Sequence, residues 1–202
     1  MMNRKRCLLL ALLMLSLALT ACRSPQTCFY TLTSVVDPGV NIQAHSPLTI
    51  GIGPVSIAGY TDRPEIVIRE SPYVVRLRDF RQWAEPLANG LPAVLLQNIA
   101  NLMPGDRVDA FPQATPSPLD YRVQVDFTRF DVSKSGQATL AARWQIFDGK
   151  TGQLAFSRTS TVSEQAADTS ADAAVAALSR TVGKLAVEIA EQVAMLAATS
   201  TS

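Results

Sequence analysis

The three strands and the long helix at the end of the chain constrain its fold most. Apolar and polar residues alternate over residues 121–128 and again over 139–146, which is the period-two pattern of half-buried strands. The turn at 148–152 then leads into a third β-rich segment, 154–162. These segments predict an antiparallel meander of three strands. One face of the meander is apolar, so another element has to cover it.

The segment from about Ser170 to Ala197 has the pattern of such a cover. Alanine is frequent in it, which gives high intrinsic helicity. Large apolar residues recur in it every three or four positions, at Val175, Leu178, Val182, Leu185, Ile189, Val193 and Leu196. The stripe could also form a coiled-coil seam. We favour a helix that lies on the sheet, because the strands that need covering are close by in the sequence.

The first half of the chain contains four strand-like segments and one helical segment. The predicted strands cover residues 29–33, 48–55, 65–69 and 73–77. Apolar residues at three- and four-residue spacing then predict a helix over 87–102. Pro86 suits its first turn, whereas Pro92 either kinks the helix or lies near the start of the main helix, after one short turn.

The N-terminus has the order of an export signal. Three cations lie within Met1–Arg6, an apolar run of 13 residues follows, and small residues then lead to Cys22. The run is shorter than the roughly 18–20 residues that cross a bilayer as a helix. The whole resembles a bacterial lipobox, which predicts a lipoprotein signal peptide over residues 1–21 and acyl chains on Cys22. The alternative is an ordinary signal peptide cleaved after Ala21.

A short lipidated tether, residues 22–28, separates Cys22 from the first predicted strand. Several acyl chains on one residue anchor a protein stably, because each buried methylene contributes about 0.8 kcal/mol. The domain is therefore expected close to its membrane. Arg23 follows Cys22, where an aspartate would resemble an inner-membrane retention signal, so the outer membrane is favoured. We expect Cys28 to be a small buried residue, although it could pair between chains.

The charge of the predicted mature chain argues against a polyanionic partner. Removal of residues 1–21 removes three cations and no acids, which leaves 15 Lys and Arg against 17 Asp and Glu, a net charge near −2. No Lys- or Arg-rich run follows Arg6. Nucleic-acid binding is therefore disfavoured.

Candidate catalytic residues are scarce. His45 is the only histidine, and neither a cysteine nor a carboxylate stands beside it, so a Ser–His–acid triad is poorly supported. A zinc site needs several His or Cys ligands, and residues 51–54 lack the third glycine and the lysine of a phosphate-binding loop. We therefore predict a protein that is not an enzyme and holds neither a metal nor another cofactor.

Two charged and aromatic motifs are more informative. The first, residues 59–67, and the second, residues 81–87, contain the candidate site residues Asp62, Arg63, Pro64, Trp83 and Glu85. Glu85 stands just before a predicted helix, where a negative charge is favourable. Arg63 or Arg81 could form a bidentate pair with it. These residues either stabilise the fold or bind a partner, and the first of these readings is favoured on the residues alone.

The order of these motifs resembles one family. An aromatic-Tyr-x-Leu strand at 29–32 is followed by the motifs at 50–55, 60–64 and 81–87. In this order they are similar to the PqiC-like family of ABC-type transport auxiliary lipoproteins. The resemblance runs from about Phe29 to the C-terminal helix and predicts such a domain over residues 29–198.

The resemblance implies a fold of the α+β class. It is a single-domain α/β sandwich, with a mixed, mostly antiparallel sheet and two main helices packed on one face. It also implies an outer-membrane lipoprotein, facing the periplasm, that works with a periplasmic protein of the mammalian-cell-entry (MCE) type and its inner-membrane module. The chain would be a non-catalytic dock for that partner in lipid transport, assembled as a homo-oligomeric ring.

Two other functions compete with this one. The first is a free-standing periplasmic lipid-binding chaperone, with an apolar cavity between helix and sheet. The second is a lipid-anchored hydrolase that depends on His45.

Overall fold

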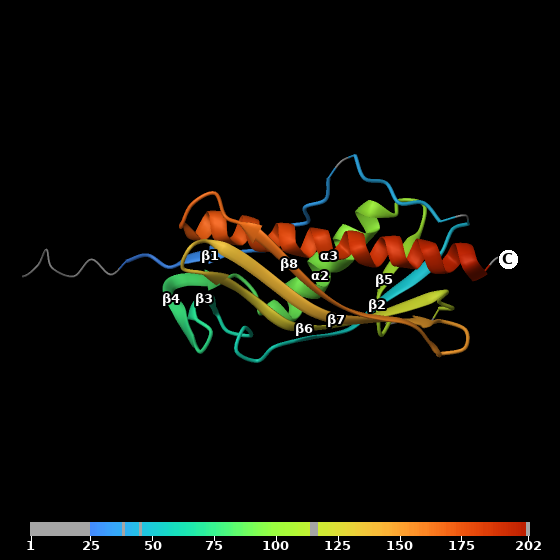
Figure 1. Ribbon diagram of the computed structural model, residues 1–202, viewed down its shortest axis with the longest axis horizontal. Coiled ribbons are helices and arrows are strands. Elements are labelled where there is room, and N and C mark those ends of the chain that lie inside the picture. The colour runs from blue at the N-terminus through green and yellow to red at the C-terminus, as the bar shows by residue number, and fades with distance from the viewer. Residues whose placement is uncertain (1–24, 38, 45, 114–116, 201–202) are drawn as a thin grey trace, which may run out of the picture.

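The predicted meander forms the centre of the computed structural model (Figure 1). It consists of β6 (Tyr121–Ser133), β7 (Gln137–Asp148) and β8 (Leu154–Gln165). Both of its ladders, β6–β7 and β7–β8, are antiparallel. The meander prediction is confirmed, and each strand is longer than the alternating pattern alone indicates.

The structure describes residues 25–37, 39–44, 46–113 and 117–200. The predicted signal peptide, Cys22 with Arg23, and His45 lie outside these residues. In the described part of the chain, no helix is long and apolar enough to span a membrane.

The second edge of β6 joins the meander to the rest of the sheet. It pairs in parallel with β2 (Thr49–Ile57) and, near its end, with β3 (Glu65–Ser71). β3 pairs antiparallel with β4 (Val74–Trp83), and β1 (Cys28–Tyr30) adds in parallel to the end of β4. β5 (Arg107–Ala110) pairs in parallel with β2. The described strands therefore form one mixed sheet, whose two longest ladders are antiparallel.

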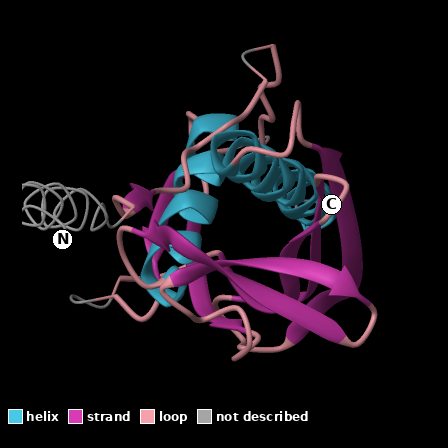
Figure 2. Ribbon diagram, turned by 90° about the vertical axis from the view of Figure 1, so that its left-hand side faces the viewer, coloured by secondary structure: helices cyan, strands magenta, loops and turns pink. Residues whose placement is uncertain are grey.

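Two helices, α2 (Leu87–Leu102) and α3 (Ala171–Ser200), cover this sheet (Figure 2). α3 packs against β6, β7 and β8, α2 packs against β2 and β5, and the helices contact each other. The α3 stripe is buried at Leu178, Val182 and Leu185, which confirms a helix on a sheet rather than a coiled-coil seam. The α+β class of fold is confirmed.

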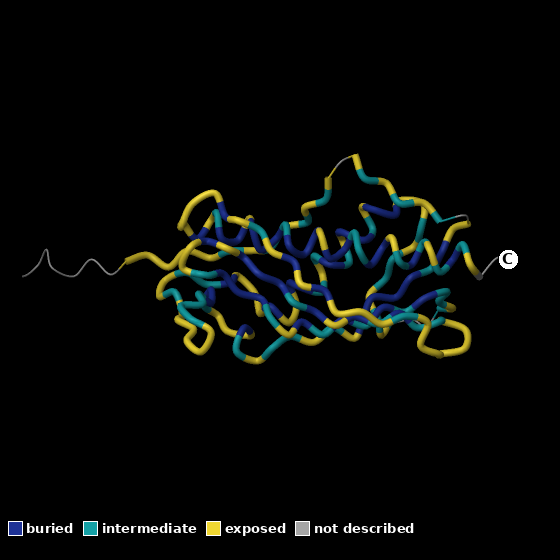
Figure 3. The backbone as a smooth tube through the Cα atoms, viewed as in Figure 1, coloured by how far each residue is buried: buried dark blue, intermediate teal, exposed yellow. Residues whose placement is uncertain are grey.

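The core lies between the helices and the sheet. Trp144, Leu95 and Ile189 are fully buried in it, and they come from β7, α2 and α3. Exposed residues gather at the turns at both ends of the long axis (Figure 3). Burial of this apolar surface is the main stabilising contribution, about 25 cal/mol for each Å² removed from water.

The segment after β1 crosses both helices. The Thr33 amide donates to Ser179 Oγ of α3 at 3.2 Å. The Val35 amide and the Ser34 hydroxyl both donate to Asn98 Oδ1 of α2, at 2.9 and 2.7 Å. These bonds hold the first part of the segment between β1 and β2 against both helices.

The structure resolves one open alternative and corrects two sequence expectations. Pro92 lies inside a single helix that begins at Leu87, so the alternative of a main helix that starts near Pro92 is wrong. The first turn of α2 is stabilised because the Asn89 and Gly90 amides donate to the Pro86 carbonyl. The strand predicted over 73–77 extends to Trp83 as β4. Finally, Cys28 is exposed, because β1 lies at the edge of the sheet.

Candidate functional site

The five candidate residues of the two motifs line one surface cleft, with a volume of ≈ 340 Å³. Its lining residues are Asp62, Arg63, Pro64, Trp83, Ala84, Glu85 and Pro86. The first three belong to the loop between β2 and β3, and the others belong to the end of β4 and the segment before α2. The fold thus brings together two motifs that are separate in the sequence.

Backbone hydrogen bonds hold the two sides of the cleft together. The Trp83 amide donates to the Pro64 carbonyl at 2.6 Å, and the Ala84 amide donates to the Tyr30 carbonyl of β1 at 2.8 Å. Trp83 is buried, whereas Asp62 and Arg63 are exposed. The indole therefore forms a rigid apolar floor beneath charged side chains that solvent can reach.

Glu85 lies against the first turn of α2. A Cβ at Gly90 would come within 3.3 Å of the Glu85 Oε1 atom, so the glycine makes room for this carboxylate. The expected ion pair with Arg63 or Arg81 is not present, since no ion pair among the described residues includes Glu85. Arg81 instead places its Nη1 3.1 Å from Cys28 Sγ. Glu85 and Arg63 thus stay exposed at the cleft without bonding each other.

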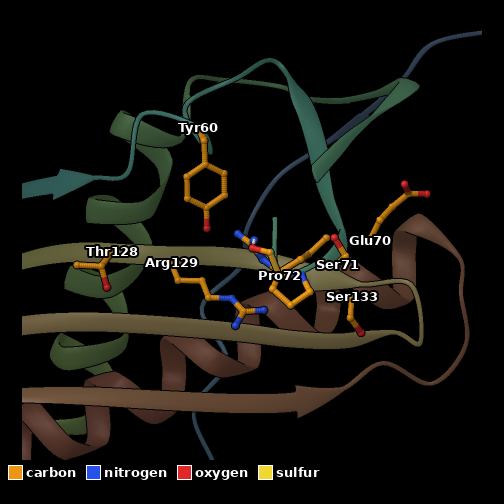
Figure 4. Close-up of a pocket in the computed structure, with 8 residues that line it drawn as sticks. Tyr60, Glu70, Ser71, Pro72, Thr128, Arg129 and Ser133 are labelled. Atoms are coloured by element: carbon orange, nitrogen blue, oxygen red, sulfur yellow. Dashed lines mark hydrogen bonds between the residues drawn. The ribbon is translucent and has the colours of Figure 1, made fainter. Parts of the chain in front are cut away.

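A second, larger cleft of ≈ 550 Å³ is lined in part by Tyr60 of the same loop (Figure 4). Its lining residues are Tyr60, Arg69, Glu70, Ser71, Pro72, Thr128, Arg129 and Ser133. Figure 4 shows Tyr60 extending from its loop toward β6, the strand that carries Arg129. Arg69 comes from β3, so the cleft lies where β3 pairs with the end of β6.

A buried carboxylate organises this second cleft. The side chain of Asp131 is fully buried, and its Oδ2 accepts hydrogen bonds from Tyr60 Oη and Arg69 Nε, both at 2.8 Å. Arg129 Nη2 donates to its Oδ1 at 2.9 Å. The Arg69 guanidinium also lies 5.3 Å from the centre of the Tyr60 ring, within the range of a cation–π contact.

These contacts shift the pKa values of the cluster. Burial raises the pKa of Asp131, but the hydrogen bonds from Arg69, Arg129 and Tyr60 outweigh burial and hold the pKa below its ordinary value. Burial and the neighbouring Asp131 raise the pKa of Tyr60. Tyr60 therefore stays protonated and remains a donor at neutral pH, and Asp131 stays charged.

The Asp131 cluster is not indicated by the sequence motifs, although Tyr60 belongs to one of them. One sequence signal is compatible with it. Arg129 and Asp131 stand two residues apart in a strand, which is the spacing of neighbours on one face. Opposite charges at that spacing can form a pair.

Both clefts offer charged and aromatic groups that can bind a ligand or a partner. The first offers an arginine and two carboxylates around a buried indole. In the second, Asp131 already engages both arginines. Within the described residues, no group of three or more His, Cys, Asp or Glu side chains could hold a metal ion. The structure thus brings the predicted residues together, and their binding role stays a prediction.

Comparison with known proteins identifies relatives at the level of family and fold. The model of a family described as "ABC-type transport auxiliary lipoprotein component" matches residues 30–190. No curated protein sequence matches the chain.

Two crystal structures share the fold. One is an uncharacterised protein that is 20% identical, with a TM-score of 0.69, and the match covers 84% of this chain and 99% of the other. The second is a Xanthomonas campestris protein of the DUF330 family, 19% identical, with a TM-score of 0.69 and coverage of 86% and 99%.

Proposed function

The chain belongs to the family of ABC-type transport auxiliary lipoproteins, and on this basis we propose that it is a non-catalytic component of an MCE/ABC-type lipid transport system. In this proposal the acyl chains on Cys22 anchor it in the outer membrane. The domain faces the periplasm and docks a periplasm-spanning MCE-domain protein, whose inner-membrane module lies at the other end.

The observation that supports docking is the first cleft. Its floor is a buried tryptophan, Trp83, and its rim carries Asp62, Arg63 and Glu85, which are exposed and form no ion pair among the described residues. Arginine is enriched among the residues that contribute most to protein–protein affinity, and Arg63 is exposed at this cleft. Exposed charges of both signs around the Trp83 ring fix the orientation of a partner.

The proposal assigns lipid handling to the partner rather than to this chain. The alternative, a free-standing lipid-binding chaperone, requires an apolar cavity between helix and sheet. That interface contains fully buried side chains from both layers, such as Leu91, Val123 and Ala186. A docking module needs no such cavity. The homo-oligomeric ring is a further prediction from the family resemblance.

Site-specific photocrosslinking in intact cells tests the docking cleft. A photoreactive amino acid replaces Arg63 in one variant and Arg143 in a control variant. Arg143 is also an exposed arginine, but it lies on β7, paired with Asp126. We expect the Arg63 position to yield a covalent adduct whose partner, identified by mass spectrometry, contains an MCE domain. Equal adducts at both positions, or none at position 63, would contradict the docking role.

The anchor is tested separately. The mass of the N-terminal peptide of the mature protein should correspond to an acylated Cys22, and Cys22→Ala should release the domain from the membrane fraction. An unmodified peptide that begins at Cys22 would support the ordinary signal peptide instead.

A further inference from the structure

The hairpin formed by β3 and β4 carries an unusual set of exposed apolar side chains. They are Tyr73 (97% exposed), Val74 (44%), Val75 (36%) and Leu77 (45%). We call these four residues the apolar hairpin. Val74, Val75 and Leu77 lie in the part of β4 that pairs with β3, and both helices pack mainly on other strands.

The apolar residues of β4 lie mainly on one face of the hairpin. Successive residues of a strand point to opposite faces, so Val75 and Leu77 share one face, whereas Val74 shares the other face with Arg76 and Arg78. Strand β6 contrasts with this pattern, because from Tyr121 to Phe127 its buried residues occupy every second position. A strand that packs on a core buries its apolar face, whereas Val75 and Leu77 of β4 stay exposed, which leaves an apolar face without a cover from the described chain.

Phe80, further along β4, adds a second observation. It has a φ of 61° and is the one residue other than glycine with a positive φ in the described chain. Such a conformation is unfavourable for a residue with a bulky side chain. The ladder between β3 and β4 is irregular here, between the pairs Val67–Leu77 and Glu65–Gln82. The strained backbone holds the Phe80 ring in a 42% exposed position, which indicates an external contact.

The apolar hairpin lies at the end of the molecule where the domain begins. β1 pairs with residues 81–83 of β4, and Figure 1 shows β1, β3 and β4 at the same end of the long axis. Cys28 is six positions after Cys22, and this stretch of chain spans at most about 20 Å when fully extended. An acyl chain on Cys22 would therefore keep this end of the domain close to the bilayer.

From these observations we infer that the apolar hairpin inserts into the surface of the lipid bilayer in which Cys22 is anchored. This inference rests on the proposed lipid anchor. The anchor holds this end of the domain at the bilayer, whose headgroups can also accept the exposed cations beside the hairpin. Tyr73, at the turn, is suited to the headgroup region, where tyrosine is enriched.

The charges beside the hairpin match a phospholipid surface. Glu70 of β3 forms ion pairs with two cations, Arg76 at 2.6 Å and Lys134 at 2.5 Å. One carboxylate thus balances two exposed cations, which leaves a local positive charge. Anionic lipids attract such cations with about 1 kcal/mol for each basic residue near the surface. The bilayer contact also orients the molecule, because the β7–β8 turn then points away from the membrane.

Tryptophan quenching tests this contact. The mature chain is purified from membranes and placed in vesicles of phosphatidylethanolamine and phosphatidylglycerol with brominated acyl chains. Tyr73→Trp carries the probe, and Leu154→Trp is the matched control. Leu154 is also exposed and apolar, but it lies on β8, next to the β7–β8 turn. It pairs with Phe147, which pairs with the first residues of β6, whereas β3 pairs with the last residues of β6. The emission of Trp83 and Trp144 is measured in the wild-type protein and subtracted from that of each variant. Tyr73 is almost fully exposed, so this variant should fold normally.

We expect the emission added by Tyr73→Trp to fall about twofold with brominated lipid, because interfacial segments bury their apolar face ~5–10 Å into the headgroup boundary. The emission added by Leu154→Trp should respond to aqueous acrylamide only. Equal access of acrylamide to both probes would overturn the inference. So would a probe at position 73 that neither quencher reaches, because a second copy of the chain would then cover the hairpin. The mass of the same preparation reports acylation of Cys22, so failure of the anchor is seen independently of the quenching.

Discussion

The Tyr60 hydroxyl donates a hydrogen bond of 2.8 Å to the buried carboxylate of Asp131. This bond joins the loop between β2 and β3 to the end of β6. The same loop contributes Asp62, Arg63 and Pro64 to the docking cleft. The position of the cleft rim therefore depends on a contact with a strand that contributes no residue to the cleft.

Tyr60→Phe removes this hydrogen bond and leaves the ring in place. A hydrogen bond to a charged group contributes about 1.5–3 kcal/mol, so we expect the free energy of unfolding to fall by roughly 1.5 kcal/mol in urea titrations. Tyr73→Phe is the control, because Tyr73 is almost fully exposed. The interpretation is wrong if the two variants are equally stable.

The charge state of Asp131 predicts a dependence of stability on pH. The pKa of Asp131 is lower in the folded protein than its ordinary value. Its charged form therefore stabilises the fold above the unfolded-state pKa of about 4, and this contribution is lost as the pH falls through the folded-state pKa. Asp131→Asn should cost about 3 kcal/mol at pH 7 and should lose less stability on acidification than the wild type.

The control for this experiment is Asp126→Asn on the same strand. Asp126 pairs with Arg143 at 3.2 Å, and both side chains are partly or largely exposed. Exposed pairs contribute about 0–1 kcal/mol. Urea unfolding measured from pH 7 into the acid range separates the two variants. Similar losses at pH 7 and parallel pH profiles would contradict the role assigned to Asp131.

Local patterns in the sequence predict the second half of the fold well. The alternation that ends at Phe127 corresponds to buried positions of β6, and the stripe of α3 corresponds to its buried face. The ladder shifts between Phe127 and Arg129, and beyond this shift Phe130 and Val132 are buried instead. A β-bulge changes which residues face the core, so the simple alternation could not be extended past it.

Long-range pairings limit what the sequence can predict in the first half. The pairing of β1 with Trp83 joins residues about fifty positions apart and makes Trp83 part of a strand. The strand β5 has four residues, too few for a recognisable alternation. The motifs identify Arg63 and Glu85 as notable residues, but only the parallel and antiparallel ladders around them place both at one cleft.

Asn98 of α2 is a buried polar residue with a specific partner. Its Oδ1 accepts hydrogen bonds from the Val35 amide and the Ser34 hydroxyl. Asn98→Ala leaves a partly buried backbone donor unpaired, so we expect a loss of about 1–3 kcal/mol in the free energy of unfolding. Asn101→Ala, an exposed position one turn further along α2, should change it by less than about 0.5 kcal/mol. Similar losses in both variants would show that the bonds to Val35 and Ser34 contribute little.

Gly183 of α3 allows the segment after β1 to pass close to the helix. A Cβ at this position would overlap the Val35 carbonyl oxygen, a backbone atom that cannot move away by a change of rotamer. Alanine is the better helix former by about 1 kcal/mol, so propensity alone predicts that Gly183→Ala is stabilising. We expect the clash to outweigh this gain and to destabilise the fold by about 1–3 kcal/mol. Gly105→Ala, where a Cβ meets nothing within 4 Å, is the control.

Urea titration gives the stability, and faster hydrogen exchange of the Val35 amide in Gly183→Ala would show that the segment has moved off Asn98. A Gly183→Ala variant more stable than the wild type, with unchanged exchange at Val35, would mean that helix propensity decides and that the close approach is not constrained.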